Sequence, residues 1–259
     1  MFNFCSLYSG SSGNSLFVQT DNTKILVDAG ESAKKIETAL NSIDVNINDI
    51  DAVIVTHEHS DHIKGLSTIS KKFDIPIYAN KETWDAMPQV AEKTKNQNLF
   101  NVNEKFEIGD LKIVPFSIPH DAANPCGFNI FYNNQKISIA TDIGHIDKKI
   151  IKNLEESSFI LLESNYDPNI LSYSKYPYSL KQRIAGPNGH LSNEAAGKTV
   201  SYLLKNVMLG HLSKENNFPE LAYKTVIDEL CASNFDENKI KIAVASRSNP
   251  SEILNLEVS

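Results

Sequence analysis

The sequence predicts a layered α/β protein in which two mixed sheets are covered by helices. Three observations predict this fold class. Short antiparallel strand runs come first in the chain, and strands then alternate with helices in both halves. The 259 residues also have the composition of an ordinary globular protein, with 41% hydrophobic and 22% charged residues. This order of elements is typical of sheets that bury one face under helices.

The expected elements follow from local patterns of apolar and turn-forming residues. Ser32 is expected to cap a helix over residues 33–40, and Asn133-Asn134 is expected to form a hairpin turn. The expected strands cover residues 2–8, 15–20, 24–30, 51–56, 75–79, 111–118, 127–132, 136–141, 158–163, 206–211 and 239–245. The other expected helices open near residue 61 and cover 82–87, 192–205 and 220–231. Because no linker or repeat divides the sequence, residues 1–259 are expected to form a single domain.

Several classes of protein are excluded by composition. No run of about 18–20 apolar residues occurs, which excludes an integral membrane protein. The start of the chain lacks the basic and apolar regions of a secretory signal. The three cysteines, Cys5, Cys126 and Cys231, are widely scattered, so neither a disulfide framework nor a cysteine-based zinc site is expected. A reduced, cytoplasmic protein is expected.

Charge is distributed unevenly along the chain. The formal net charge is −7, which by itself disfavours non-specific binding to nucleic acid. Residues 175–214, however, hold six basic residues and one acidic residue, so that this segment is +5 and the rest of the chain is −12. The basic segment makes an anionic substrate plausible despite the acidic total.

The strongest chemical signal is the segment THEHSDH, residues 56–62, directly after an expected strand. His57 and His59 are two residues apart, so an extended backbone directs both side chains to the same side. A turn entering a helix can bring Asp61 and His62 back to a common point. Imidazoles and a carboxylate suit a divalent ion such as zinc. The alternative is a surface cluster that holds no metal.

This segment matches the HxHxDH motif and therefore resembles the metallo-β-lactamase superfamily. Four further residues follow apolar strand runs in that family's order: Asp28, His120, Asp142 and His211. The resemblance implies a four-layer αββα sandwich with a binuclear metal site, which Asp28 supports from beside the ligands. It assigns His57, His59 and His120 to one ion, Asp61, His62 and His211 to the other, and Asp142 to both.

Two branches of the superfamily are disfavoured by individual residues. Secreted β-lactamases commonly have a cysteine near Asp142 and lack a histidine at the position of His62. Flavodiiron proteins have a glutamate in place of the second histidine, which is His59 in this chain. Neither branch fits this sequence.

Glu163 and His190 resemble the glutamate and histidine motifs of transfer-RNA 3′-processing endonucleases of the superfamily. In those enzymes the glutamate orients the histidine, which serves the leaving group. A departing alkoxide needs a proton, and a carboxylate-held histidine is a suitable acid. Asp61, Glu163 and His190 are the catalytic candidates. The alternative is a strand-end carboxylate and an unrelated loop histidine.

Residues 165–183 interleave four tyrosines with basic residues, a pattern that suits stacking on bases and contacts with phosphates. Tyr176, Lys181 and Arg183 are the candidates for binding substrate. A lid whose tyrosines pack on the body is an equally good interpretation. The segment SGSSGNS, residues 9–15, could present backbone N–H groups to phosphate, but a hairpin turn is favoured. His145 receives no role beyond its closeness to Asp142.

In its motifs and length the chain resembles one bacterial branch, the WalJ (YycJ)-type single-domain metallohydrolases, which are linked with DNA exonuclease activity. The resemblance implies a phosphodiesterase that removes nucleotides from the 5′ end of DNA, with RNA as another substrate to consider. Attack would come from a hydroxide shared by two divalent ions, expected to be zinc, although manganese or iron also suits the ligands. The alternatives are a glyoxalase-II-like thioester or lactone hydrolase and a non-catalytic regulatory protein. No membrane partner is expected.

Overall fold

The computed structural model describes residues 1–233 and 239–257. The chain forms two compact units. The first comprises Met1–Ser117, Ala122–Gln135 and Ser246–Ser259, and the second comprises Ile118–Asp121 and Lys136–Ala245. The expectation of a single domain stays a prediction.

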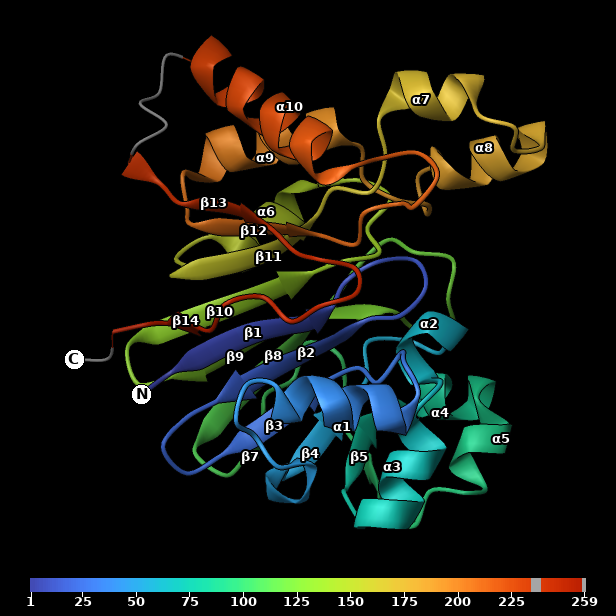
Figure 1. The fold of residues 1–259 in the computed structure, drawn as a ribbon, viewed down its shortest axis with the longest axis vertical. Helices are drawn as coiled ribbons and strands as arrows, with labels where there is room; N and C mark the ends of the chain where they lie inside the picture. Colours follow the sequence, from blue (N-terminus) through green and yellow to red (C-terminus); the bar gives the residue numbers. More distant parts are fainter. Residues whose placement is uncertain (234–238, 258–259) are drawn as a thin grey trace. The chain divides into compact units, whose positions relative to one another are not determined.

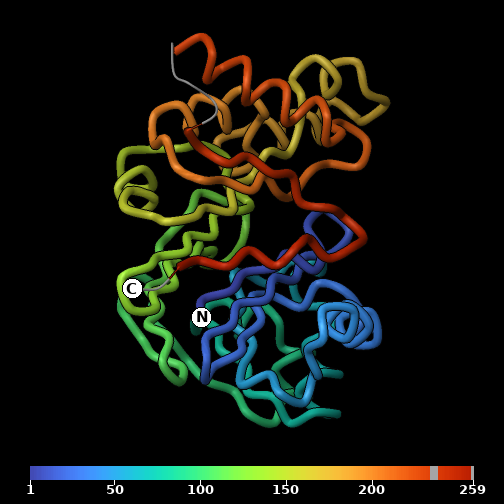
Figure 2. Tube along the Cα trace, turned by 60° about the vertical axis from the view of Figure 1, so that its left-hand side comes forward, coloured from blue at the N-terminus to red at the C-terminus, as the bar shows by residue number. Residues whose placement is uncertain are grey.

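The first unit contains a seven-stranded mixed sheet. Its strands, in spatial order, are β14 (Leu254–Asn255), β1 (Asn3–Tyr8), β2 (Ser15–Gln19), β3 (Lys24–Val27), β4 (Ala52–Ile54), β5 (Ile77–Ala79) and β6 (Gln97–Leu99). Strands β14 to β3 pair antiparallel, and β3 to β6 pair parallel. In Figure 2 the red C-terminal segment runs beside the blue N-terminal strand, and Phe4 pairs with Leu254.

Helices of the first unit cover one face of this sheet (Figure 1). They are α1 (Ala33–Asn41), the 3-10 helix η1 (Ile47–Asp49), α2 (Ser60–Ile63), α3 (Leu66–Phe73), α4 (Lys81–Ala86) and α5 (Pro88–Ala91). The Ser32 side chain accepts a hydrogen bond from the Lys35 amide, which confirms the expected cap. Ile36 and Ile69 of the helices join Val53 of the sheet in one buried cluster. Burial of this apolar face stabilises the helices, which are short.

Three antiparallel strands of the first unit pack on the same sheet: β7 (Phe106–Ile108), β8 (Leu111–Ser117) and β9 (Cys126–Tyr132). Aromatic rings join the two layers. The Phe100 and Phe128 ring centroids are 5.6 Å apart, and those of Tyr78 and Phe106 are 5.9 Å apart. The buried core of this unit therefore lies on both faces of its seven-stranded sheet.

The second unit contains four parallel strands: β10 (Gln135–Ala140), β11 (Phe159–Glu163), β12 (Val207–Gly210) and β13 (Ile242–Val244). Its helices are α6 (Lys148–Leu154), α7 (Pro168–Tyr173), α8 (Tyr178–Ile184), α9 (Asn193–Leu203) and α10 (Pro219–Ala232). Helices α9 and α10 lie side by side along these strands (Figure 1). Because the strands are parallel, the residues that follow β10, β11 and β12 emerge at one sheet edge.

The chain thus has two mixed sheets flanked by helices, as the sequence predicts. The α-helices α5, α6, α7 and α8, the 3-10 helix η1 and the short strands β6, β7 and β14 were not among the expected elements. Helix α7 begins where the Asp167 carboxylate accepts hydrogen bonds from the Asn169 and Ile170 amides, a capping signal within the tyrosine-rich segment. No helix among the described residues is long and apolar enough to cross a membrane.

Candidate metal centre and its neighbouring acid

In the first unit, Asp28 fixes the start of the histidine segment. Its Oδ1 accepts the Thr56 amide at 2.8 Å, and its Oδ2 accepts the Thr56 hydroxyl, also at 2.8 Å. The same Oδ2 is 2.7 Å from Nδ1 of His62, and both side chains are buried. With Nδ1 bound to a carboxylate, Nε2 is the His62 nitrogen that would bind a metal. Asp28 thus holds both Thr56 and His62, and its support of a metal site stays a prediction.

The other members of the segment lie close to His62. Nε2 of His57 is 3.0 Å from Nδ1 of His59, and the His57 and His62 ring centroids are 4.1 Å apart. His59 occupies the residue before α2, and Asp61 lies in the first turn of that helix. The turn entering a helix therefore brings Asp61 and His62 together, with 3.5 Å between Asp61 Oδ2 and His62 Nε2.

Asn14 is a site residue that the sequence analysis did not identify. Its Nδ2 lies 3.2 Å from Oδ2 of Asp61 and 3.1 Å from Nε2 of His62. The SGSSGNS segment forms the turn between β1 and β2, as favoured from the sequence, and Asn14 ends that turn. An asparagine in a loop is usually interpreted as a turn residue, so the sequence held no separate signal for this contact.

Gly30 lets two loops of the first unit approach helix α2 closely. Its amide donates to the Asn14 carbonyl at 2.7 Å, and the Asn14 amide donates to the Asp61 carbonyl at 2.8 Å. A Cβ atom on Gly30 would lie 1.6 Å from that Asp61 oxygen. Only glycine permits this approach of backbone to backbone, so Gly30 helps to place Asp61.

In the second unit, Asp142 lies among three histidines. Its Oδ1 is 3.4 Å from Nδ1 of His211, 3.7 Å from Nε2 of His120 and 3.8 Å from Nδ1 of His190. Nδ1 of His120 is 3.1 Å from the Gly189 carbonyl, which directs Nε2 of His120 toward Asp142. Asp142, His120 and His211 are therefore grouped in this unit, and all three are buried.

Glu163 is the centre of the hydrogen-bond network in the second unit. Oε1 lies 2.8 Å from Nδ1 of His190 and 2.7 Å from Nδ1 of His211. Oε2 accepts the backbone amides of Ile143 at 2.9 Å and Leu191 at 3.0 Å. The side chain is completely buried. Burial would raise the pKa of Glu163, but the two histidines outweigh burial and lower it, so the carboxylate is the stable form.

His190 gains proton affinity from the same contact. Burial alone would lower the pKa of His190, but the Glu163 carboxylate outweighs that effect and raises the pKa above the usual value for histidine. With Nδ1 held by Glu163, a protonated His190 carries its second proton on Nε2. The contact joins the two residues that the sequence pairs, and the role of His190 as an acid stays a prediction.

Three site residues have left-handed backbone, which is uncommon for residues other than glycine. The φ angle is 63° at Asp28, 57° at Asp142 and 53° at His211. Asp28 directly follows β3, His211 directly follows β12, and Asp142 lies two residues beyond β10. Such strain costs of the order of 1–3 kcal/mol per residue and clusters at functional sites. It distinguishes these residues from ordinary strand ends.

The tyrosine-rich segment places its basic residues in contacts with the second unit itself. Nε of Arg183 is 2.5 Å from Oδ2 of Asp121, and its Nη2 is 3.1 Å from Oδ1. Nζ of Lys181 donates to the Ser172 carbonyl at 2.7 Å, and Tyr176 packs against a small apolar cluster. Substrate contacts by Tyr176, Lys181 and Arg183 stay predictions. His145 directs Nδ1 to the Pro187 carbonyl at 2.9 Å.

The residues present fit divalent metal ions. In the second unit, one ligand atom from each of four residues lies within 4.8 Å of the others: Asp142, Glu163, His190 and His211. In the first unit, the nitrogens of His57 and His59 face each other at hydrogen-bond distance. Zinc and manganese sites typically have imidazole and carboxylate ligands. Those ligands are typically held by hydrogen bonds to a second carboxylate or to a backbone carbonyl. That the ligands of the two units converge on two ions stays a prediction.

Comparisons with known proteins agree with these observations. The family described as "Beta-lactamase superfamily domain" matches residues 23–211. The chain is 39% identical over 238 residues to a Bacillus anthracis protein named exodeoxyribonuclease YycJ, with 90% of each chain covered. It is 38% identical over 241 residues to Streptococcus pneumoniae exodeoxyribonuclease WalJ, again with 90% of each covered.

Among solved structures, the metallo-β-lactamase fold protein YhfI from Bacillus subtilis has a TM-score of 0.71 at 15% identity, with 97% of this chain and 100% of that chain covered. At this identity the likeness shows the fold alone. The family match spans most of the chain and includes Asp28, the histidine segment and His211. The chain therefore belongs to the metallo-β-lactamase superfamily, as its ordered motifs predict.

Proposed function

We propose that this chain is a binuclear metal-dependent phosphodiesterase that removes nucleotides from the 5′ end of DNA. The observation that carries the proposal is the Glu163–His190 contact of 2.8 Å, with His211 on the same carboxylate oxygen. Hydrolysis of a phosphodiester expels an alkoxide, which needs a proton. Thioester hydrolysis expels a thiolate, a much weaker base that leaves without an acid. The two relatives named exodeoxyribonuclease support DNA as the substrate.

Each group of residues has a defined task in this proposal. His57, His59 and His120 would hold one ion, Asp61, His62 and His211 the other, and Asp142 both. Two such ions, zinc or manganese, would supply positive charge for the phosphate and lower the pKa of the attacking water. Asp28 and Asn14 hold His62 and Asp61 in position. His190 holds a proton at Nε2 for the leaving oxygen, and Glu163 keeps that imidazole oriented and charged.

Parallel assays on one metal-loaded preparation test the proposal. The substrates are single-stranded DNA labelled at either end, RNA of the same sequence, bis(p-nitrophenyl) phosphate and a thioester. We expect mononucleotides to be released from the 5′ end of DNA, slower cleavage of RNA, and no hydrolysis in protein stripped by a chelator. Thioester hydrolysis faster than phosphodiester hydrolysis would favour the glyoxalase-II-like alternative instead. If none of the substrates is hydrolysed, the result would favour a non-catalytic regulatory protein.

A further inference from the structure

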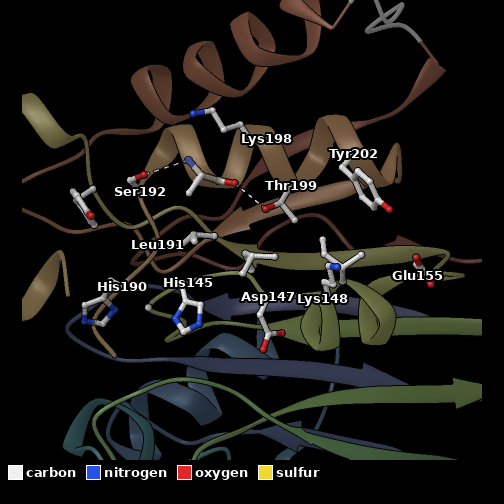
Figure 3. Close-up of a pocket in the computed structure, with 15 residues that line it drawn as sticks. His145, Asp147, Lys148, Glu155, His190, Leu191, Ser192, Lys198, Thr199 and Tyr202 are labelled. Carbon is white, nitrogen blue, oxygen red and sulfur yellow. Dashed lines mark hydrogen bonds between the residues drawn. The ribbon is translucent and has the colours of Figure 1, made fainter. Parts of the chain in front are cut away.

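A large cavity in the second unit lies directly beside His190. It has a volume of about 780 Å³ and extends between α6 and α9. Figure 3 shows His190 and His145 at one end of it, and Tyr202 and Glu155 at the other. Every residue that lines the cavity belongs to the second unit. Its size lies in the range of pockets that enclose a small molecule such as a nucleotide.

The position of His190 indicates which part of the substrate would lie in the cavity. An acid must touch the oxygen that it protonates, so the group attached to the leaving oxygen lies on the side of the acid. In hydrolysis from a 5′ end, water adds to phosphorus and the P–O3′ bond breaks. The 3′ oxygen of the terminal nucleotide takes the proton from His190, and the new 5′ phosphate stays on the shortened strand. The terminal nucleotide is therefore the group that lies beyond His190.

The lining of the cavity has the mixed chemistry that a nucleotide needs. Tyr202 is 68% exposed and offers a ring face for stacking on a base. Lys148 and Lys198 are exposed cations suited to a phosphate, and Glu155 can accept hydrogen bonds from base amino groups. Asp147 is occupied in part by capping α6 at the Ile150 amide. The lining contains two lysines and two acidic residues. This balance of charge disfavours a simple anion, such as inorganic phosphate, as the ligand.

A buried phenol adds an independent polar group to the wall. Tyr166 is 8% exposed and lines the cavity. Its phenol oxygen forms no hydrogen bond with the residues that the structure describes. Burial, followed by the nearby Glu163 and Glu194 carboxylates, raises the pKa of Tyr166, so the hydroxyl keeps its proton and can donate it in a hydrogen bond. Because Tyr166 lines the cavity, its hydroxyl can donate to a ligand or to water there.

We propose that the cavity between α6 and α9 binds the terminal nucleotide as it leaves, with its base against Tyr202 and its own 5′ phosphate near Lys148 and Lys198. The inference rests on the proposed function. The cavity volume of about 780 Å³ is large enough for one nucleotide.

Binding of mononucleotide to the metal-loaded protein tests this assignment without relying on turnover. The probes are deoxyadenosine 5′-monophosphate, deoxyadenosine and inorganic phosphate, measured by calorimetry. We expect the monophosphate to bind most tightly. Tyr202→Ala and Lys198→Met should each weaken its binding by about 5- to 100-fold, the scale of one lost stacking or charged contact. The matched controls are Tyr223→Ala on α10 and Lys152→Met on α6, which do not line the cavity and should bind normally.

Two results would overturn the assignment. One is inorganic phosphate binding as tightly as the monophosphate, which would mean that the metal centre alone holds the probe. The other is normal binding by both the Tyr202 and Lys198 variants. Failure of the proposed function has a different signature, since a protein that releases no nucleotide from DNA fails that proposal whatever its affinity for the probe. Release of nucleotides together with unaffected variants defeats the cavity assignment alone.

Discussion

Glu163 and His211 share a hydrogen bond of 2.7 Å between Oε1 and Nδ1, on the same carboxylate oxygen that holds His190. One buried carboxylate therefore orients both a proposed metal ligand and the proposed acid. The sequence motifs pair Glu163 with His190 alone. The contact with His211 depends on the parallel pairing of β11 with β12, which places Glu163 opposite Gly210, one residue before His211.

Glu163→Gln should impair metal binding and catalysis together. A glutamine oxygen carries no negative charge and holds the two imidazole N–H groups more weakly, and its NH2 group cannot accept the backbone amides that Oε2 accepts, so both histidines are oriented less firmly. We expect metal affinity to fall by about 10- to 100-fold, and the rate on DNA to fall further because His190 also loses its partner. Metal titration and kinetics at saturating metal separate the two losses. A variant with normal metal affinity would show that the His211 contact does not matter.

His190→Ala should keep nearly normal metal content while cleavage of DNA slows by about 10²- to 10⁴-fold, the usual scale for an acid–base group. The loss should be smaller on bis(p-nitrophenyl) phosphate, because p-nitrophenolate leaves without a proton. Steady-state rates on both substrates, with metal analysis of the same samples, check this. Equal losses on the two substrates would rule out a leaving-group acid, and loss of metal would make His190 a ligand.

Asp142→Ala should abolish activity and weaken the binding of both ions, because the proposed function makes this carboxylate a ligand of both. Equilibrium dialysis of the variant against zinc, followed by counting of bound ions per chain, makes the measurement. Retention of one ion at the affinity of the unsubstituted protein would contradict a shared ligand. Asn129→Ala, a buried polar position in β9, serves as a control for general destabilisation.

Gly30→Ala should destabilise the first unit by about 2–4 kcal/mol, since the new methyl group would overlap the Asp61 carbonyl and force two backbone segments apart. Chemical denaturation gives the free energy of unfolding. The matched control is Ser12→Ala in the exposed part of the neighbouring turn, which should change stability by less than about 0.5 kcal/mol. A stable Gly30→Ala protein would mean that this approach of backbones is easily relaxed.

Glu31→Gln should destabilise the protein by about 0.5–1 kcal/mol near neutral pH and have little effect in acid. Burial would raise the pKa of Glu31, but Lys35 at 2.8 Å and Lys64 at 3.5 Å outweigh burial and lower it. A carboxyl whose pKa is lower in the folded state stabilises that state above its unfolded pKa, about 4.3. This stabilisation is lost as the pH falls through the folded pKa. Unfolding curves at pH 7 and at about pH 3 should therefore differ in their sensitivity to the substitution.

The sequence predicted most of the fold because strand runs and caps are local signals. Ser32 shows this well, since a serine before an amphipathic segment indicates a helix start whatever the tertiary context. The grouping of Asp142 with His120 and His211 was predictable because the superfamily motif fixes the order of these residues, and their role as metal ligands stays a prediction. The contacts of Asn14 and Gly30 were not predictable, because they depend on two loops and helix α2, which are distant in the sequence, meeting in space.

The helices of the tyrosine-rich segment were missed for a related reason. Helix α8 begins after Pro177 without a side-chain cap, and Ile184 is its buried apolar residue. Its position depends on tertiary contacts, among them the pair between Arg183 and Asp121. A segment rich in tyrosine, serine and lysine can form either a helix or an irregular loop, and its composition alone does not distinguish the two.

The left-handed residues Asp28, Asp142 and His211 have a consequence for how this protein can be redesigned. Glycine would relax the backbone at each position, so Asp142→Gly is expected to remove a side chain and a source of strain at the same time. Directed selection for heat resistance alone would then favour inactive chains, because the substitutions that relieve strain also remove two proposed ligands, Asp142 and His211, or the carboxylate of Asp28 that holds His62. A library screened for thermostability must therefore be screened for activity at every round, or these three positions must be held fixed.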